Sequence, residues 1–203
     1  MTGHAHGAGL DPALSPVPGG GCAVRIRAAV VTVSDKGHAG IREDASGPVL
    51  RDLLVQLGAE VAPIQIVPDE QDQIETLLIG LADGGEVDLV LTTGGTGLAP
   101  RDRTPEATRA VVDRLAPGFG EAMRAASMAI TPRAMLSRAI AGVRGRTLII
   151  NMPGSPKACR EHFAVIAPAL KHAVETLRGE AYECASPAIV DAAADGDCLK
   201  QPV

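Results

Sequence analysis

Apolar residues along this chain form short continuous runs that alternate with segments of helical periodicity. Residues 27–35, 60–69 and 87–93 are such runs, and they suit strands buried on both faces of a parallel sheet. Residues 47–58 instead carry apolar side chains three and four positions apart, which predicts an amphipathic helix ended by Gly58. The alternation predicts an α/β fold: a three-layer α/β/α sandwich with a mostly parallel central sheet.

Helical periodicity continues after the first two strands. It covers residues 70–83, 104–116 and 118–128. Thr104 followed by Pro105 suits the start of the middle helix, with the threonine as N-cap and the proline as first helical residue.

The pattern changes after Pro132. We expect a small extended arm or hairpin that turns at Arg144-Gly145, followed by a strand at residues 147–152. Residues 155–179 predict one or two further helices.

The two ends of the chain lack any periodicity. Residues 1–22 are dominated by Gly, Ala and Pro, which predicts a disordered N-terminal tail. Residues 183–203 predict a second tail. The remaining residues, 23–182, have the length of a single domain.

Composition excludes several classes of function. The formal net charge is −5 and only Phe119, Phe163 and Tyr182 are aromatic, so we expect no nucleic-acid surface. No apolar run reaches the length of a membrane span, and we expect no secretory signal. The four cysteines lack metal-site spacing, which favours free thiols in a reducing cytosol and hence a cytoplasmic protein.

Polar residues follow four of the predicted strands. Parallel α/β sheets bind ligands at the carboxyl ends of their strands, so these four segments are where a site is expected. They are Ser34-Asp35, Pro68-Asp69, residues 92–102 and residues 151–157. Ser34 and Asp35 alone are also typical of a common turn.

The third of these segments contains Thr93, Gly94, Gly95, Thr96 and Gly97. Glycines let backbone N–H groups approach a phosphate closely, and hydroxyls add donors. A tight turn that needs positive φ angles explains the glycines alone equally well. Thr92 and Thr93 before them and the charged pair Arg101-Asp102 after them favour the anion site. The sequence is neither a Walker A loop nor a dinucleotide-binding fingerprint.

Two aspartates at neighbouring strand ends form a candidate metal pair. Asp69 is also a good N-cap for the following helix, whereas Asp102 lies in a loop beside Arg101 with no clear helix to cap. Carboxylates in such a pair suit Mg²⁺ that bridges nucleotide phosphates.

The last strand is followed by a second candidate anion site. The Asn151 amide can bind the polar edge of a heterocycle. Ser155 suits a helix N-cap, and the helix N-terminus with Lys157 beside it suits an anion. By contrast, His162 and His172 are expected on the surface of a helix. The sequence contains no G-x-S-x-G nucleophile motif.

Five segments occur in order between residues 27 and 179: VSDKGHAGIREDASGPVL, IVPDE, VLTTGGTGLAPRDRTPEAT, PGFGEAMR and LSRAIAGVRGRTLIINMPGSPKACRE. Together they resemble the molybdopterin adenylyltransferase family, which comprises the Mog-type bacterial proteins and the G domains of gephyrin and its plant counterpart. TTGGTG, PRD and TPEA are shared with the wider molybdopterin-binding fold, and the stretch from LSR to NMPGSPK narrows the resemblance to the adenylyltransferases.

The resemblance implies transfer of AMP from ATP to the terminal phosphate of molybdopterin, with Mg²⁺ required and pyrophosphate released. Asp69 matches the aspartate of the family's P-D-E segment, and Asp102 matches that of its P-R-D segment, 33 positions later (102 − 69). Ser137 matches a serine that the family associates with the pterin. Family ligand-binding loops match residues 93–97 and the segment Asn151, Met152, Pro153, Gly154 and Ser155.

The resemblance also implies a homotrimer, with hexamers in some members, and a downstream molybdenum insertase as partner. Our hypothesis is that Asp69 and Asp102 hold Mg²⁺ and orient the attacking phosphate. The glycine loop would then bind the nucleotide phosphates, and Arg101 or Lys157 would offset their charge.

Three alternatives stay open at this point. The first is a MoaB-like protein that binds or carries molybdopterin without adenylylating it. The second is a non-catalytic scaffold that delivers the cofactor, and the third is a generic nucleotide-binding sensor. Tight pterin binding without product would favour the first two, and ATP turnover without pterin would favour the third.

Overall fold

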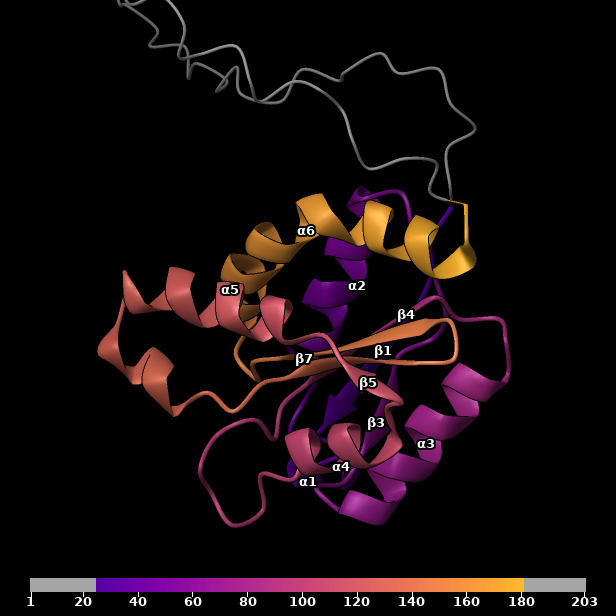
Figure 1. Ribbon diagram of the computed structural model, residues 1–203. Helices are drawn as coiled ribbons and strands as arrows, with labels where there is room; N and C mark the ends of the chain where they lie inside the picture. The colour runs from indigo at the N-terminus through magenta and orange to yellow at the C-terminus, as the bar shows by residue number, and fades with distance from the viewer. Residues whose placement is uncertain (1–24, 181–203) are drawn as a thin grey trace, which may run out of the picture.

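The computed structural model describes residues 25–180, which form a central sheet between two layers of helices (Figure 1). The predicted tails, residues 1–22 and 183–203, lie outside the described residues. The strands are β1 (Arg27–Val33), β2 (Glu60–Val61), β3 (Gln65–Val67), β4 (Leu89–Thr93), β5 (Arg114–Leu115), β6 (Ala141–Arg144) and β7 (Thr147–Met152). The helices are α1 (Asp35–His38), α2 (Gly47–Gln56), α3 (Gln71–Asp83), α4 (Thr104–Val111), α5 (Pro117–Met128), the 3-10 helix η1 (Pro132–Leu136) and α6 (Pro156–Arg178).

The sheet has the order β2-β1-β4-β7-β6-β5, and β3 pairs with the far end of β1. Pairing is parallel from β2 and β3 through β7, and antiparallel between β7, β6 and β5. The predicted hairpin is therefore β6–β7, and its turn contains Gly145 at φ 56°. The predicted three-layer fold with a mostly parallel sheet is confirmed.

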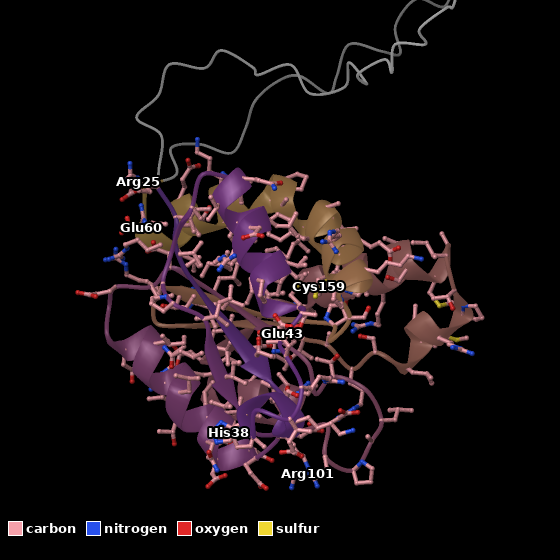
Figure 2. All side chains as sticks on the ribbon, turned by 180° about the vertical axis from the view of Figure 1, so that it is seen from behind. Arg25, His38, Glu43, Glu60, Arg101 and Cys159 are labelled. Atoms are coloured by element: carbon pink, nitrogen blue, oxygen red, sulfur yellow. The ribbon has the colours of Figure 1, made fainter. Side chains whose placement is uncertain are left out.

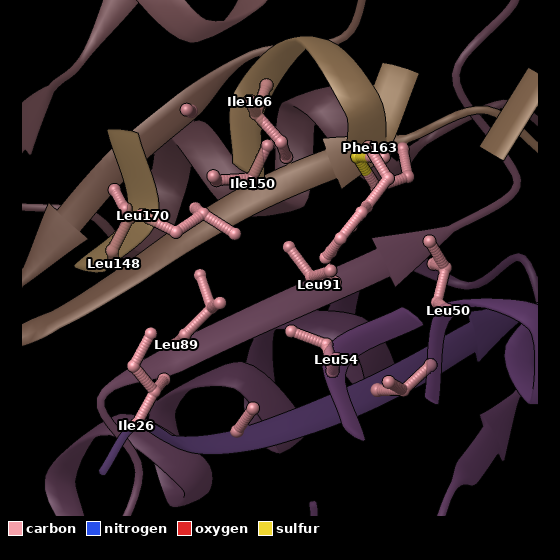
Figure 3. Packing of buried hydrophobic residues seen from close by; sticks show 14 of the residues in the cluster. Ile26, Leu50, Leu54, Leu89, Leu91, Leu148, Ile150, Phe163, Ile166 and Leu170 are labelled. Atoms are coloured by element: carbon pink, nitrogen blue, oxygen red, sulfur yellow. The ribbon is translucent and has the colours of Figure 1, made fainter. Parts of the chain in front are cut away.

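Alternate residues of the central strands face two separate cores, which is why their sequences read as continuous apolar runs. Leu89 and Leu91 of β4 lie in one core, with Leu148 and Ile150 of β7. Figure 3 shows this core between the sheet and helices α2 and α6. Val90 faces the opposite core, which α3 and α4 cover. Helices α2, α5 and α6 therefore form one outer layer, and α3 and α4 form the other (Figure 1).

The predicted second strand, residues 60–69, is divided in the structure. Ala62 still donates its N–H to the Ala28 carbonyl, but Pro63 has no N–H and cannot continue the ladder. The chain then returns to β1 as β3, where Val67 pairs with Val33. The prediction of one continuous strand was wrong for this reason.

The predicted helix at residues 104–116 is shorter and begins differently. It ends at Val111, because Asp113 donates its N–H to the Val143 carbonyl and starts the pairing of β5 with β6. Thr104 is the first helical residue, not the N-cap. Its hydroxyl donates instead to the Gly94 carbonyl at 2.8 Å.

The last helix, α6, is a single helix despite Pro168 in its interior. Ser155 is its N-cap, as predicted, and accepts a hydrogen bond from the Ala158 N–H at 3.2 Å. Gly179 ends the helix in the left-handed conformation, at φ 76°.

Cys159 is a free thiol buried in α6, and burial raises its pKa to about 11. The other three cysteines lie outside the described residues. Within residues 25–180, no helix has both the length and the apolar character that crossing a membrane requires.

Candidate functional site

The carboxyl ends of four parallel strands lie side by side at one edge of the sheet. Val33 pairs with Val67, and Thr93 pairs with both Thr32 and Met152. The chain leaves β1 for β3 on one side and returns to β4 on the other. This reversal of strand order is the position at which such sheets bind ligands.

A pocket of about 270 Å³ lies at these strand ends. Two helices, α2 and α6, begin beside it, so that both direct the positive ends of their dipoles toward the same space. This arrangement suits an anion. The lining residues are Thr32, Val33, Ser34, Gly37, Arg42, Glu43, Asp44, Ala45, Ser46, Thr93, Gly94, Gly154, Ser155 and Pro156.

Asp44 organises the wall of this pocket, although it was not among the predicted site residues. Its carboxylate accepts from the Thr32 hydroxyl at 2.6 Å and from the N–H groups of Ser46 and Gly47 at 3.0 Å. A Cβ on Gly47 would lie 2.3 Å from the same carboxylate. The signal was the D-x-S-G spacing before a helix, in which the aspartate performs the capping.

The glycine loop after β4 is shaped by close approaches within the protein. Gly94 has φ 102°, and a Cβ there would lie 2.2 Å from the Val33 carbonyl oxygen. A Cβ on Gly95 would lie 3.1 Å from the Asp69 carboxylate, and one on Gly97 would lie 2.9 Å from the Asp102 carboxylate. The positive φ angles of Gly94 and Gly95 agree with the tight-turn interpretation, and the anion site stays a prediction. The glycines bring both candidate aspartates against one loop.

Asp69 is held by a reciprocal pair of hydrogen bonds with Asp35. The Asp35 N–H donates to the Asp69 carboxylate at 2.9 Å, and the Asp69 N–H donates to the Asp35 carboxylate at 3.0 Å. Asp69 does not cap α3, because Glu70 holds the N-cap position without a side-chain bond. The capping alternative for Asp69 was wrong.

Arg101 binds the outer carboxylates of this cluster. It donates to Asp35 at 2.8 and 3.0 Å and to Glu70 at 2.8 Å. In Figure 2 it lies at the same end of the molecule as His38 of α1. Its charge therefore offsets carboxylates of the protein in this structure, whereas we expected it to offset phosphate.

Asp69 and Asp35 have opposite electrostatic environments. Burial raises the pKa of Asp69, the nearby charges of Asp35 and Asp102 raise it further, and the Asp35 N–H and Arg101 only partly oppose this. The hydrogen bond from Arg101 and that from the Asp69 N–H lower the pKa of Asp35. A cation bound beside Asp69 would therefore stabilise the ionised form of its carboxylate.

Metal ligands at this place would come only in part from the protein. Within the described range, no group of three or more His, Cys, Asp or Glu side chains could hold a metal ion. Asp69 and Asp102 supply two carboxylates, and the Asp102 carboxylate also accepts from the Ala99 N–H at 2.8 Å. Such an incomplete set fits Mg²⁺, which keeps waters and takes substrate phosphate oxygens as ligands.

A second pocket, of about 290 Å³, is lined by residues of α5, η1 and α6 and by the later part of the glycine loop. Ser137 lines it together with Thr96, Gly97 and Pro153, so the glycine loop contributes to both pockets. Its walls are apolar around a few polar groups, as in sites for flat heterocycles.

His162 lines this second pocket and is buried, so its predicted place on the helix surface was wrong. Its Nε2 lies 2.6 Å from the Ser127 hydroxyl, and burial lowers its pKa. His172 is exposed, as predicted.

Two of the predicted ligand-binding side chains are buried and bonded within the fold, and a third extends into solvent. The Asn151 amide is fully buried and donates to the hydroxyls of Thr92 and Thr108 at 3.0 and 2.8 Å, which leaves it no donor for a heterocycle. Thr93 is also fully buried and donates to the Pro153 carbonyl at 2.7 Å. Lys157 is exposed, with its Nζ 3.7 Å from Glu161.

The fold and the site together define an α/β ligand-binding protein with acidic, glycine-rich strand ends. Residues 29–172 match the family described as the probable molybdopterin binding domain. The molybdopterin adenylyltransferase of Helicobacter pylori J99 is 44% identical over 156 residues, covering 76% of this chain and 89% of the relative. That of Escherichia coli K12 is 44% identical over 140 residues, covering 67% and 71%.

Solved structures agree with this assignment. The molybdopterin biosynthesis enzyme MoaB from Thermus thermophilus is 49% identical, with a TM-score of 0.73, and the match covers 78% of this chain and 99% of that one. This chain belongs to the probable molybdopterin binding domain family, and the resemblance drawn from its motifs is confirmed.

Proposed function

We propose that this protein is a molybdopterin adenylyltransferase, which transfers AMP from Mg-ATP to the terminal phosphate of molybdopterin and releases pyrophosphate. One observation carries the proposal: the glycine loop lines both pockets, and Asp69 and Asp102 lie against its glycines. A reaction that joins two bound anions needs this arrangement, with acidic groups at the junction to recruit a cation. The names of the relatives support the same reaction.

The two pockets divide the substrates between them in this proposal. The pocket at the start of α2 and α6, with Ser34, Gly154 and Ser155, takes the nucleotide phosphates, since the positive ends of both helix dipoles lie beside it. The pocket with Ser137 takes the pterin, because its walls are mostly apolar with a few polar groups. The terminal phosphate of the pterin then lies beside the glycine loop.

The residues of the chain mainly position the two substrates and neutralise the charge of their phosphates. Mg²⁺, when bound by Asp69 and Asp102, supplies positive charge to the phosphate oxygens. The attacking phosphate oxygen is already anionic near neutral pH, so no strong general base is required. Arg101 can exchange Asp35 for phosphate, because it is an exposed side chain beside the same carboxylates.

The MoaB-like binder is the less favoured alternative, because the Helicobacter pylori and Escherichia coli relatives, which match along most of this chain, are named adenylyltransferases. We further propose a homotrimer in the cytoplasm that passes its product to a molybdenum insertase. An interface between copies of the chain is supported by apolar side chains exposed around the α5–η1 turn: Met128, Ile130, Met135 and Leu136.

The test is AMP transfer by the full-length chain with molybdopterin and Mg-ATP, read as adenylylated product and pyrophosphate. Asp69→Asn and Asp102→Asn are each expected to lower kcat on the order of 1,000-fold, as loss of a metal ligand would. Asp52→Asn, an exposed aspartate paired with Arg51, is the control and should be unchanged. Full turnover by either site variant would contradict the assigned role.

A further inference from the structure

One arginine side chain binds both ends of the loop that carries Asp102. We call residues 97–102 the acidic loop. Arg138 Nε donates to the carbonyl of Gly97 at 2.6 Å, and its Nη2 donates to the carbonyl of Asp102 at 2.6 Å. The Arg138 N–H also donates to the Thr96 carbonyl at 3.0 Å. The guanidinium therefore fixes the distance between the first and last residues of the loop.

The remaining nitrogen of the same guanidinium is anchored on α4. Arg138 Nη1 donates to Glu106 Oε1, in the first turn of that helix. Glu106 Oε2 is buried and has no hydrogen-bond partner among the described residues. Arg138 is thus the group that compensates the Glu106 carboxylate, and the pair ties the acidic loop to a helix that packs on the sheet.

Arg101 also restrains the acidic loop from outside, through its hydrogen bonds to Asp35 and Glu70. Leu98 is 64% exposed, and the Arg101 side chain is 53% exposed. Inside the loop, Asp102 donates its N–H to the Ala99 carbonyl at 2.9 Å, and the Asp102 carboxylate accepts from the Ala99 N–H at 2.8 Å. Ion pairs as exposed as those of Arg101 hold a segment weakly, and the Arg138 side chain, 31% exposed, is the better-buried restraint on the loop.

We propose that Arg138 is a positioning residue for the reaction: it holds the acidic loop so that Asp102 faces Asp69, with Glu106 as its anchor. This rests on the proposed function. Arg138 also follows Ser137, which lines the pterin pocket, so it connects that pocket to the loop at the junction of the substrates. Because a displacement of about 1 Å can cost about 100-fold in rate, a loosened loop should slow transfer strongly.

The test compares Arg138→Lys with Arg144→Lys in the full-length chain. Lysine keeps the charge but cannot bind three acceptors in the planar fork of arginine. Arg144 is the matched control, since it also donates to a carboxylate, Asp83, and to a carbonyl, that of Val111, but lies away from the site. We expect Arg138→Lys to lower kcat about 100-fold and to raise the Mg²⁺ concentration needed for half-maximal rate.

Molybdopterin affinity and melting temperature should stay close to those of Arg144→Lys, which a merely structural role would not give. A second readout is hydrogen exchange at the amides of Ala99 and Asp102, which should become faster only in Arg138→Lys. Equal kcat or equal exchange in the two variants would overturn the role of Arg138. The exchange measurement needs no turnover, so a wild-type chain that transfers no AMP would contradict the proposed function alone.

Discussion

A carboxylate lies at each end of the central sheet, and the two differ in how well hydrogen bonds and ion pairs compensate their charge. At the amino ends of the strands, Asp88 is 3% exposed and directly precedes β4. It accepts from the main chain and side chain of Arg27 and from the side chain of Arg178. At the carboxyl ends, Asp69 is half-buried, with carboxylates as neighbours and an arginine that is bonded to Asp35.

The pKa values record this difference. Burial alone would raise the pKa of Asp88, but hydrogen bonds from Arg27 and Arg178 outweigh it and lower the pKa to about 2. Burial likewise raises the pKa of Asp69, and there the compensation is too weak to reverse it. A completed ion-pair network stabilises the fold, whereas an incompletely compensated carboxylate at a strand end is suited to recruiting a cation.

The largest expected effect on stability comes from removing the charge of Asp88. Asp88→Asn would leave Arg27 and Arg178 without their carboxylate, which should lower the free energy of unfolding by about 3 kcal/mol. Chemical denaturation at neutral pH measures this. Asp83→Asn is the control, because Asp83 forms a similar arginine pair on the exposed surface, and its loss should be much smaller. Equal losses would mean that the Asp88 network is no more than a surface ion pair.

Acid should remove the same contribution in the wild-type chain. The folded pKa of Asp88 is about 2 against an ordinary value of 3.8. Its stabilisation is therefore fully present above pH 3.8 and is lost as the pH falls through about 2. The pKa difference corresponds to about 2 kcal/mol.

The measurement is the difference in unfolding free energy between wild type and Asp88→Asn, followed from pH 5 to pH 2. This difference should shrink toward the acid end, because other carboxylates contribute equally to both proteins. A difference that is constant with pH would show that the Asp88 charge is not what stabilises the network.

The fold could be predicted largely from apolar periodicity, because both faces of β1, β4 and β7 are covered. One error came from a distant partner, and the other from a proline within the apolar run. Pairing of β5 with β6 ended the predicted helix at Val111, and Pro63 interrupted a strand that periodicity alone would continue. Such pairing is set by contacts far apart in sequence, which a local pattern does not contain.

For the candidate site, the sequence predicted which segments lie together at one edge of the sheet. It predicted the contacts of their side chains only in part. The rule for strand ends brought Asp69 and Asp102 to one loop. The same rule placed Asn151 at the site, but its amide faces Thr92 and Thr108 inside the fold. Strand-end position fixes where a residue lies and leaves the direction of its side chain to tertiary packing. The hydrogen bonds of Arg138 to the Gly97 and Asp102 carbonyls were missed for the same reason.

The smallest expected effect on stability is that of Asp69→Asn, and it is opposite in sign to that of Asp88→Asn. Asp69→Asn removes a charge that folding disfavours, while the amide oxygen can still accept from the Asp35 N–H. A raised folded pKa means that the wild-type carboxylate costs stability as the pH rises above its ordinary value of 3.8. At neutral pH, Asp69→Asn should therefore be at least as stable as wild type, and this advantage should disappear below that pH.

Thermal and chemical denaturation at pH 7 and pH 3.5 would measure this advantage beside Asp88→Asn. The same aspartate would then be needed for AMP transfer and unfavourable for folding, as expected where a site keeps a charge for its ligand. A loss of stability in Asp69→Asn would instead place Asp69 with Asp88 as a structural carboxylate, and the contrast between the two ends of the sheet would fail.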